Sequence, residues 1–316
     1  PEVGDCWLDA GIVPFSTLDY FKDEAHWEQW FPAEFICEMR EQVRLWFYST
    51  LFMSVTLKDR APYKAVLAYE KVYDEKGDPM HKSKGNSVPF DEAADQMGAD
   101  AMRWMYAGAS IETNLRFGYG PAKEVRRKLL TFWNVYSFFV EYANIDKPDL
   151  SGKLAPETAG LAELDRWILA RLNRFLSVCA RQYDAYLTLP VVAEADRFFD
   201  DLSNWYLRRC RSRFWKEAMD ADKAAAYRTL YHILLSTTKA MAPILPFSME
   251  EMYGNLRAAD PALSESVHLC VFPDADPRWE DDALLAGMSA VQQVVRLGHA
   301  ARAEARLRVR QPLAAC

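Results

Sequence analysis

The spacing of apolar and polar positions changes about 120 residues into the chain. Before that point, short apolar runs typical of strands alternate with helical patterns, and turn-forming residues separate them, as in α/β layer structures. The strand-like runs lie at 12–15 and 65–70, and the helical patterns at 39–53, 90–97 and 99–107. We therefore predict an α/β part over residues 1–120.

From residue 121 onward, apolar residues recur at three- and four-residue spacing, which is typical of helices packed on neighbours. In 190–219 the apolar stripe consists of Val191, Ala195, Phe198, Leu202, Trp205 and Tyr206. Helices are predicted at 121–143, 161–187, 190–219, 222–242, 246–257 and about 278–303, with an extended stretch at 267–274. We predict an all-α helical bundle over 121–316 and place the domain boundary between Gly118 and Pro121.

The composition narrows the protein class. Of the 316 residues, 50% are hydrophobic and 13% aromatic, which is enough apolar material for one large or two ordinary domains and excludes a disordered chain. The net charge is −7, so no overall positive field attracts nucleic acid. An RNA contact would have to come from a local basic patch.

The cysteines and the apolar runs bear on location. Six cysteines are scattered without any C-x-x-C pair, at positions 6, 37, 179, 210, 270 and 316. Such thiols suit a reducing cytoplasm, and no apolar run reaches the roughly 18 residues that a membrane helix needs. Because the chain begins at Pro1 without an initiator Met, we expect it to be cut from something longer.

Two stretches of the α/β part carry residues that suit a binding site. The first is "DCWLDAG" at 5–11, a turn in which Trp7 could equally be a core residue. The second is "EMREQVRLWF" at 38–47. If this stretch is helical, Glu38, Gln42 and Trp46 share one face, which is poor core material because buried charges need partners. A solvated rim is the alternative.

A third stretch, "MHKSKGN" at 80–86, combines lysines with small polar residues on a loop. Lysine ammonium groups, hydroxyls and free backbone N–H groups bind phosphate, and Lys82, Ser83, Lys84 and Gly85 supply all three. By itself the loop could equally be an ordinary solvated turn.

The order of these motifs, followed by "GADAMRW" at 98–104, resembles the second half of the nucleotide-binding domain of class I aminoacyl-tRNA synthetases. The loop is similar to the K-M-S-K-S signature of that family. Within the branch for branched aliphatic amino acids, the helical part resembles the isoleucyl enzymes. The stretches that carry this second resemblance are "TFWNVYSFFVEYAN" (131–144), "DDLSNWYLRRCRSRFW" (200–215), "MAPILPFSMEEMY" (241–253), "SVHLCVFPD" (266–274) and "RVRQPL" (308–313).

The resemblance implies a Rossmann-type fold followed by a helical anticodon-binding domain, and a reaction that uses ATP, isoleucine, tRNA(Ile) and Mg²⁺. Lys82 matches the lysine that contacts ATP phosphate and Ser83 the serine after it, and positive donors there offset the charge that builds on phosphoryl oxygens. Met80 and His81 belong to the same ATP-binding loop. The adenylate-binding segment falls on Glu38, Met39, Glu41 and Gln42, and the isoleucine pocket on Trp7 and Trp46.

The chain departs from the family pattern at several of these positions. The first lysine of the signature is Pro79 and its first serine is His81. In the adenylate segment Met39 replaces Gly, Glu41 replaces Asp and Leu45 replaces Gly. The chain also has no H-x-G-H segment, and the editing domain of the family would precede the region matched here. We therefore expect a fragment that is inactive alone.

A basic segment of the helical part is the candidate tRNA-binding patch. It contains Arg208, Arg209, Arg211, Arg213 and Lys216, interleaved with Trp205, Tyr206 and Trp215. Guanidinium groups neutralise phosphate, and aromatic rings stack on splayed bases. The alternative is that some of these arginines pair with acids such as Asp200 and Asp201. A second basic strip consists of Arg302, Arg306, Arg308 and Arg310.

The resemblance thus implies a monomeric, cytoplasmic fragment of an isoleucyl-type synthetase, with tRNA(Ile), isoleucine and ATP as partners, and we identify no metal-ligating residues in it. Two alternatives stay open. The chain could be a non-catalytic tRNA-binding module derived from such an enzyme, or part of a valine-type ligase.

Overall fold

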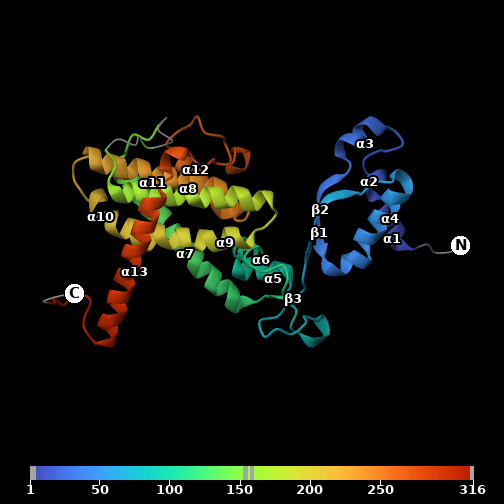
Figure 1. The fold of residues 1–316 in the computed structure, drawn as a ribbon, viewed down its shortest axis with the longest axis horizontal. Helices are drawn as coiled ribbons and strands as arrows, with labels where there is room; N and C mark the ends of the chain where they lie inside the picture. The colour runs from blue at the N-terminus through green and yellow to red at the C-terminus, as the bar shows by residue number, and fades with distance from the viewer. Residues whose placement is uncertain (1–4, 152–155, 157–159, 314–316) are drawn as a thin grey trace. The chain divides into compact units, whose positions relative to one another are not determined.

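The structure is a computed structural model that describes residues 5–151, 156 and 160–313 (Figure 1). The chain divides into two compact units. One consists of residues 1–93 and 109–121, and the other of residues 94–108 and 122–316. Residues 94–108, which contain helix α6 (Ala99–Ala107), therefore group with the helical unit. Our boundary between Gly118 and Pro121 stays a prediction.

The first unit is built around a parallel pair of strands, β1 (Ala33–Met39) and β2 (Tyr63–Tyr69), in which Met39 lies opposite Tyr69. Parallel strands need a crossover connection. The chain crosses through the 3-10 turn η1 (Arg40–Arg44) and helix α4 (Trp46–Lys58) (Figure 1). This βαβ arrangement confirms the α/β class and the strand predicted at 65–70.

The amino-terminal segment is helical where we predicted a turn and a strand. Helix α1 (Cys6–Gly11) begins at Asp5, whose carboxylate accepts a hydrogen bond from the Trp7 backbone N–H at 2.9 Å. Helix α2 (Val13–Ser16) carries a proline in its first turn, where proline is tolerated. The turn predicted at 5–11 and the strand predicted at 12–15 are therefore both wrong. The Asp5 cap and the proline of α2 favour helix starts, and the spacing of apolar residues does not reveal such effects.

The stretch 38–47 is not one helix either. Glu38 lies in β1, Gln42 lies in η1, and Trp46 begins α4. The backbone of Leu45, at φ −122° and ψ −107°, interrupts the helical path. The shared helical face predicted for these side chains is therefore wrong, although Gln42 still contacts Trp46 through the Trp46 backbone N–H.

Helices α1 and α4 pack closely, and a small aromatic cluster forms beside them. A Cβ atom on Gly11 would lie 2.7 Å from the carbonyl oxygen of Ser49, so only glycine fits at this contact. Helix α3 (Glu24–Trp30) contributes Trp27, which stacks on Phe31 with ring centroids 4.3 Å apart. Phe15 completes this cluster of buried rings.

A second parallel pair, β3 (Val72–Tyr73) with β4 (Leu115–Arg116), frames the lysine-containing loop. After β3 the chain runs through a 3-10 turn, η2 (Lys82–Lys84), into helix α5 (Phe90–Met97). The predicted helices at 90–97 and 99–107 are confirmed as α5 and α6.

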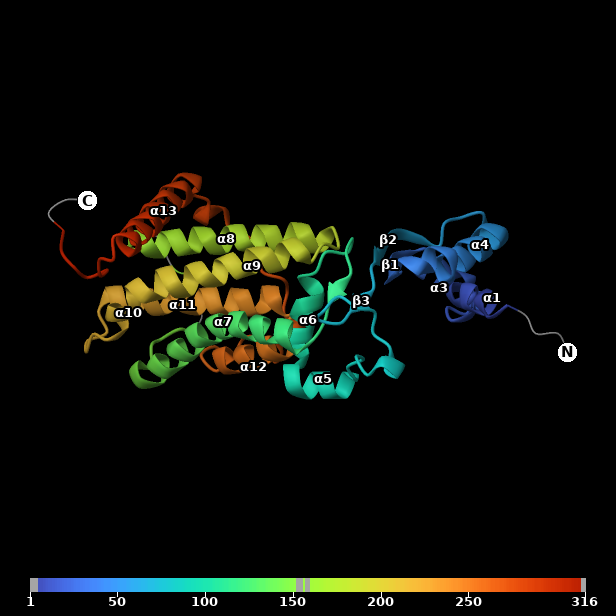
Figure 2. The same cartoon turned by 90° about the horizontal axis from the view of Figure 1, so that it is seen from below.

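The helical unit confirms the predicted bundle. Its helices are α7 (Tyr119–Asp146), α8 (Glu163–Asp184), α9 (Leu189–Asp200), α10 (Arg208–Phe214), α11 (Ala221–Met241), α12 (Pro246–Arg257) and α13 (Asp282–Glu304). Helix α8 packs against α9 and α11, and α11 packs against α12 (Figure 2). One continuous hydrophobic core joins these helices, with large rings such as Phe175 and Phe198 fully buried.

Between α9 and α10 the chain forms a π-helical segment, η3 (Asp201–Leu207), so the helix predicted at 190–219 is continuous but changes its winding and ends at Phe214. π-helical segments are rare and often occur at functional sites. The stretch at 267–274 begins with a short 3-10 turn, η4 (Val267–Leu269), where we predicted an extended chain. Among the helices that the structure describes, none is both long and apolar enough to span a membrane.

Candidate functional site

The candidate adenylate-binding segment lies where the parallel strands β1 and β2 end. Because Met39 pairs with Tyr69, the next residues of the two strands lie side by side. Arg40 pairs with Glu70 at 2.5 Å, and Glu41 pairs with Lys71 at 2.7 Å. Ligands of open α/β sheets bind at the carboxyl ends of parallel strands, so these ion pairs hold the backbone at the edge where a ligand is expected.

Glu41 is the acidic residue of this segment with an open acceptor. Its Oε1 atom accepts a hydrogen bond from Lys71, which holds the pKa of the Glu41 carboxyl below its usual range. Its Oε2 atom has no donor from another residue in the described ranges, and the backbone N–H of Glu41 itself also helps to lower this pKa. The side chain is 41% exposed, so a ligand hydroxyl or ammonium group can reach the carboxylate.

The other residues of the segment contact the backbone around them. Glu38 Oε2 accepts from the Met39 N–H at 3.2 Å, and Gln42 Oε1 accepts from the Trp46 N–H at 3.0 Å. The Gln42 amide thus caps the start of α4. Trp46 donates its indole N–H to the Ala10 carbonyl at 3.1 Å. Trp46 therefore joins α4 to α1, the helix that carries Trp7, which is half-buried.

Asp74 and Asn86 fasten the lysine-containing loop at its two ends. The Asp74 carboxylate accepts from the backbone N–H of Asp78 at 2.8 Å and from the Asn86 amide at 2.9 Å. These bonds hold the pKa of Asp74 below its usual range. Asn86 Oδ1 in turn accepts from the His81 N–H at 2.9 Å, and its amide also donates to the Pro79 carbonyl. The loop is therefore closed by a network that the sequence analysis missed.

At the tip of this loop, Lys82, Ser83 and Lys84 form the exposed turn η2. Gly85 ends the turn at φ +69°, a conformation that favours glycine. Within the described parts of the chain, neither lysine pairs with a carboxylate. A positively charged turn on a fastened loop is suited to bind a phosphate-bearing ligand, since it need not break an ion pair first.

The base of the loop meets Gly118 and the first turn of α7. Glu75 Oε1 accepts a hydrogen bond from the Gly120 N–H at 2.8 Å. A Cβ atom on Gly118 would lie 2.1 Å from the Cγ atom of Glu75, which excludes any larger residue without a shift of this side chain. The glycines in "FGYG" (117–120) therefore let Glu75 of the loop approach their backbone closely, a role that the sequence alone did not reveal.

The arginines of the candidate tRNA patch have different environments. Arg213 donates to both oxygens of Asp165, at 2.7 and 2.8 Å, and also pairs with Asp222. Asp165 is fully buried, and it also accepts from the hydroxyl of the fully buried Tyr206 at 2.7 Å. Burial alone would lower the pKa of Arg213, but the hydrogen bonds and charge of Asp165 raise it well above its usual range.

This network favours the alternative role for Arg213, as the partner of a core carboxylate rather than of tRNA. The prediction that Asp200 and Asp201 pair with arginines of this segment is wrong. Asp201 accepts hydrogen bonds from Arg171 and Gln292, and Asp200 accepts one from the Asn204 amide. Tyr206 is likewise unavailable for base stacking because it is fully buried. Lys216 is also paired, with Asp220 at 2.8 Å and Asp222 at 2.9 Å.

Arg208, Arg209 and Arg211 are exposed on α10. The Arg209 guanidinium lies 3.3 Å from the ring centroid of Trp205, an arrangement that pre-orders a flat cationic surface. Trp215 is 60% exposed, although its indole N–H donates to the Tyr142 hydroxyl. These residues keep the chemistry expected of a single-stranded RNA contact.

The second basic strip is partly used by the chain itself. Arg302 donates to the backbone carbonyls of Arg308 and Gln311, at 3.0 and 2.8 Å, and so fixes the turn after α13. Arg306, Arg308 and Arg310 are exposed.

A groove of about 740 Å³ lies beside the arginine segment, among α8, α9, η3 and α13. Its charged lining residues are Arg171, Arg174, Glu194, Arg197, Asp200, Asp201, Asp282 and Arg296. Arg171 is paired there with Glu194 at 3.0 Å and Asp201 at 2.8 Å. The sequence did not reveal this groove because its lining comes from helices that are distant in the chain.

Two family models match the chain. Residues 1–118 match "tRNA synthetases class I (I, L, M and V)", and residues 165–316 match "Anticodon-binding domain of tRNA ligase". The isoleucine–tRNA ligase of Thermus thermophilus is 44% identical over 99% of this chain, and that of Dehalococcoides mccartyi (strain ATCC BAA-2266 / KCTC 15142 / 195) is 42% identical. The chain belongs to the class I tRNA synthetases. It spans about 30% of the length of these curated relatives.

Solved synthetase structures share the fold of this synthetase chain. A leucyl enzyme from Agrobacterium radiobacter K84, in a ternary complex with tRNA and LeuAMS, gives a TM-score of 0.70 at 15% identity, covering 88% of this chain and 33% of its own. The Mycobacterium tuberculosis methionyl-tRNA synthetase, in complex with methionyl-adenylate, gives a TM-score of 0.65 at 16% identity. The match covers 78% of this chain and 48% of the methionyl enzyme. These likenesses confirm the Rossmann-like and helical architecture.

The two family matches divide the candidate residues of this synthetase chain into two groups. The class I match contains the strand ends at Glu38–Gln42 and the loop at 80–86. The anticodon-binding match contains the arginine segment and the groove beside it. The recognition made from the sequence is confirmed, whereas the roles of single residues stay predictions.

Proposed function

We propose that this chain is the part of an isoleucine–tRNA ligase that binds ATP phosphates through one unit and tRNA(Ile) through the other. The complete enzyme joins the isoleucine carboxylate to the α-phosphorus of ATP, releases pyrophosphate, and transfers the isoleucyl group to tRNA with release of AMP. Relatives named isoleucine–tRNA ligase, 40–44% identical over 99% of this chain, support this substrate. We also propose that the protein acts as a monomer in the cytoplasm.

The observation that carries the proposal is the fastened loop, whose lysines have no carboxylate partner among the described residues. Asp74 and Asn86 hold the loop, and Lys82 is exposed at its tip. When the isoleucine carboxylate attacks, negative charge grows on the phosphoryl oxygens and on departing pyrophosphate. A positive donor held in position stabilises that charge without reorganising, and we assign this role to Lys82, with Ser83 as a hydrogen-bond donor.

The strand-end segment is the proposed adenylate site. The free Oε2 atom of Glu41 would accept a hydrogen bond from the ribose or from the substrate ammonium group. Glu38, Met39 and Gln42 would line the same site. Trp7 and Trp46 are the proposed walls of the isoleucine pocket, and their flat rings suit a branched hydrocarbon. Since one methylene is worth only about 1–3 kcal/mol, valine is rejected incompletely there.

Before Lys82 in the proposed ATP loop, Met80 keeps the family pattern, whereas Pro79 and His81 depart from it. His81 is exposed. Mg²⁺ is part of the proposed reaction, but no group of three His, Cys, Asp or Glu side chains in the described ranges could hold a metal ion. The proposal therefore assigns Mg²⁺ to no side chain of this chain and routes no step through it.

The proposed tRNA interface consists of Arg208, Arg209 and Arg211, with Trp205 and Trp215 beside them. The cation over the Trp205 ring supports it, because a base can stack on a surface that is already ordered. We retain Arg213 only as a residue that positions α10. Its bonds to Asp165 must survive for the exposed arginines to keep their places.

The first test is binding of this chain to tRNA(Ile) and to the same tRNA with a swapped anticodon, at one salt concentration. Tighter binding of the native anticodon supports a ligase-derived reader. Equal binding would reduce the helical unit to an electrostatic platform, and no binding would contradict the proposed interface.

The second test concerns the reaction and uses the full-length protein. Isoleucine-dependent exchange between ATP and pyrophosphate supports the ligase, whereas faster exchange with valine supports the valine-type alternative. A full-length protein that binds tRNA but catalyses no exchange with any amino acid would establish the non-catalytic module instead.

A further inference from the structure

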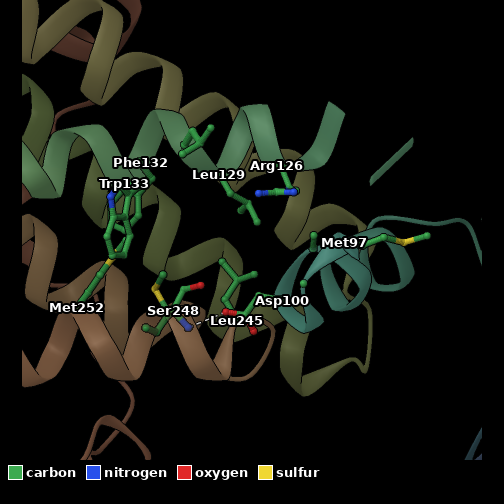
Figure 3. A pocket seen from close by; sticks show the side chains of 13 residues that line it. Met97, Asp100, Arg126, Leu129, Phe132, Trp133, Leu245, Ser248 and Met252 are labelled. Carbon is green, nitrogen blue, oxygen red and sulfur yellow. Dashed lines mark hydrogen bonds between the residues drawn. The ribbon is translucent and has the colours of Figure 1, made fainter. Parts of the chain in front are cut away.

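A cavity of about 230 Å³ opens among helices α6, α7 and α12 of the helical unit (Figure 3). Its walls are mainly apolar. They are formed by Met97, Ala101, Leu129, Leu130, Phe132, Trp133, Leu245, Met249 and Met252. Trp133 and Leu130 on α7 are 37% and 53% exposed, so the cavity communicates with solvent. None of the residues assigned to ATP, isoleucine or tRNA lines it.

Arg126 is the cationic group of this cavity. It lies on α7 one turn before Leu130, it is exposed, and Figure 3 shows its side chain beside Leu129. Its hydrogen bond to the Gln96 carbonyl is long, at 3.4 Å. No carboxylate in the described ranges pairs with it. The guanidinium therefore keeps donors for a ligand, in contrast to its neighbour Arg127, which is paired with Glu124 at 2.7 Å.

Asp100 is the acidic group of the cavity, and the backbone at the start of α12 offsets its charge. Its two oxygens accept from the backbone N–H groups of Ser248 at 2.6 Å and Phe247 at 3.4 Å, at the start of α12 (Figure 3). The amino end of a helix carries a partial positive charge, which offsets the carboxylate. The uncompensated charge of the cavity is therefore positive and belongs to Arg126.

We propose that this cavity binds a small carboxylic acid with one aromatic ring or a short branched aliphatic body. The ring or chain would lie against Leu129, Phe132 and Met249, and the carboxylate would accept a paired hydrogen bond from Arg126. The size agrees, since an apolar cavity of about 150 Å³ holds benzene and this one leaves space for a short chain as well. The site is independent of the proposed ligase reaction.

Such a ligand would contact three helices that are distant in the sequence. Because it binds the folded chain and not the unfolded one, it would raise the thermal midpoint of the helical unit, and the midpoint would keep rising with the logarithm of ligand concentration above the dissociation constant. The carboxylate would also stiffen the start of α7, where Arg126 has a single long hydrogen bond.

The test uses this chain with three probes that share one body: 3-phenylpropanoate, 3-phenylpropan-1-ol and 3-phenylpropan-1-amine. Calorimetry and tryptophan fluorescence, to which Trp133 contributes, measure the affinity. We expect the acid to bind with a dissociation constant of about 1 mM and the other two about tenfold more weakly. Tightest binding of the amine, equal binding of all three, or no binding up to about 20 mM would overturn the proposal.

Matched variants locate the site. Arg126→Met should weaken binding of the acid about tenfold and leave the affinity for the alcohol unchanged, because only the charged contact is lost. Arg127→Met removes the same charge one residue away and should change neither affinity. Ser248→Leu, which keeps the backbone bond to Asp100 and fills the cavity, should weaken all three probes. If Arg127→Met weakened the acid as much as Arg126→Met, a diffuse field and not this cavity would explain the binding.

Discussion

Two short basic stretches of this synthetase chain, the turn Lys82–Lys84 and the segment Arg208–Arg213, look alike in the sequence and differ in the structure. In the turn, the lysines are exposed without carboxylate partners in the described ranges, and Asp74 and Asn86 hold the loop from its ends. In the arginine segment, Arg213 is 11% exposed and paired with the buried Asp165. One stretch keeps its charge exposed to solvent, and the other gives part of its charge to the core.

The difference shows that a basic run is a binding site only to the extent that its partners are absent. Successive residues of a helix point in different directions, so a run of arginines on α10 must divide between core and solvent. A tight turn with no core beneath it has no such constraint. Four experiments sharpen or break this comparison.

The largest effect is expected for Arg213→Met. It leaves the Asp165 carboxylate buried without its cation, which should lower the free energy of unfolding by about 3–5 kcal/mol. Urea denaturation of this chain measures it. Arg211→Met is the matched control and should cost less than about 0.5 kcal/mol. Adding Asp165→Asn to Arg213→Met should recover part of the loss, and a loss below about 1 kcal/mol in the single variant would show that the pair is not a core element.

The next effect concerns the turn. Lys82→Met in the full-length protein should slow isoleucine-dependent ATP–pyrophosphate exchange about 100-fold, because a positioned donor to the developing charge is lost. Lys76→Met, in the same loop, should change the rate less than about twofold. Equal losses in the two variants would mean that the loop contributes only a general positive field.

A smaller effect is expected when the loop keeps its lysines and loses the hydrogen bonds of Asn86 that hold it. Asn86→Ala removes the bonds to His81, Asp74 and Pro79, so kcat/KM for ATP should fall about tenfold through poorer positioning. Asp78→Ala is the control, since only the backbone N–H of Asp78 serves the network. An unchanged kcat/KM in Asn86→Ala would show that bound ATP orders the loop without this network.

The smallest effect is expected for the exposed arginines. Replacing Arg208 and Arg209 together by Met should weaken tRNA(Ile) binding about fivefold and reduce the slope of log affinity against log salt by about 2. Binding measured at several salt concentrations gives both quantities. A loss of affinity with an unchanged slope would mean that the variants disturb Trp205 stacking and not phosphate contacts.

Much of the fold could be predicted because helical periodicity is a local property. The long helices α7, α8, α11 and α12 lie close to their predicted ranges, since apolar residues recur at helical spacing over several turns of each, even in α11, which is buried on nearly all sides. The predictions that are wrong lie in the short elements of the first unit. There a backbone break at Leu45 and the cap at Asp5 decide the conformation, and neither has a periodic signal.

In the candidate site too, the features that are local in the chain could be predicted and the contacts between separate elements could not. The motif order identified the family and the residues that belong to the loop and the strand end, because those residues are close together in the chain. It did not reveal that Glu41 is held by Lys71, that Asn86 fastens the loop, or that Asp165 takes Arg213 out of the tRNA patch. Each of these contacts joins residues from separate elements.

The order of residues was enough to identify the class of fold, the family and the chemical nature of the candidate groups. Which of the charged groups are exposed depends on the packing of the folded chain. A charge buried in the core must be paired, whereas an exposed one need not be, and burial depends on how distant helices pack. Asp165 on α8 and Arg213 on α10, 48 positions apart in the chain, became partners only when the bundle closed.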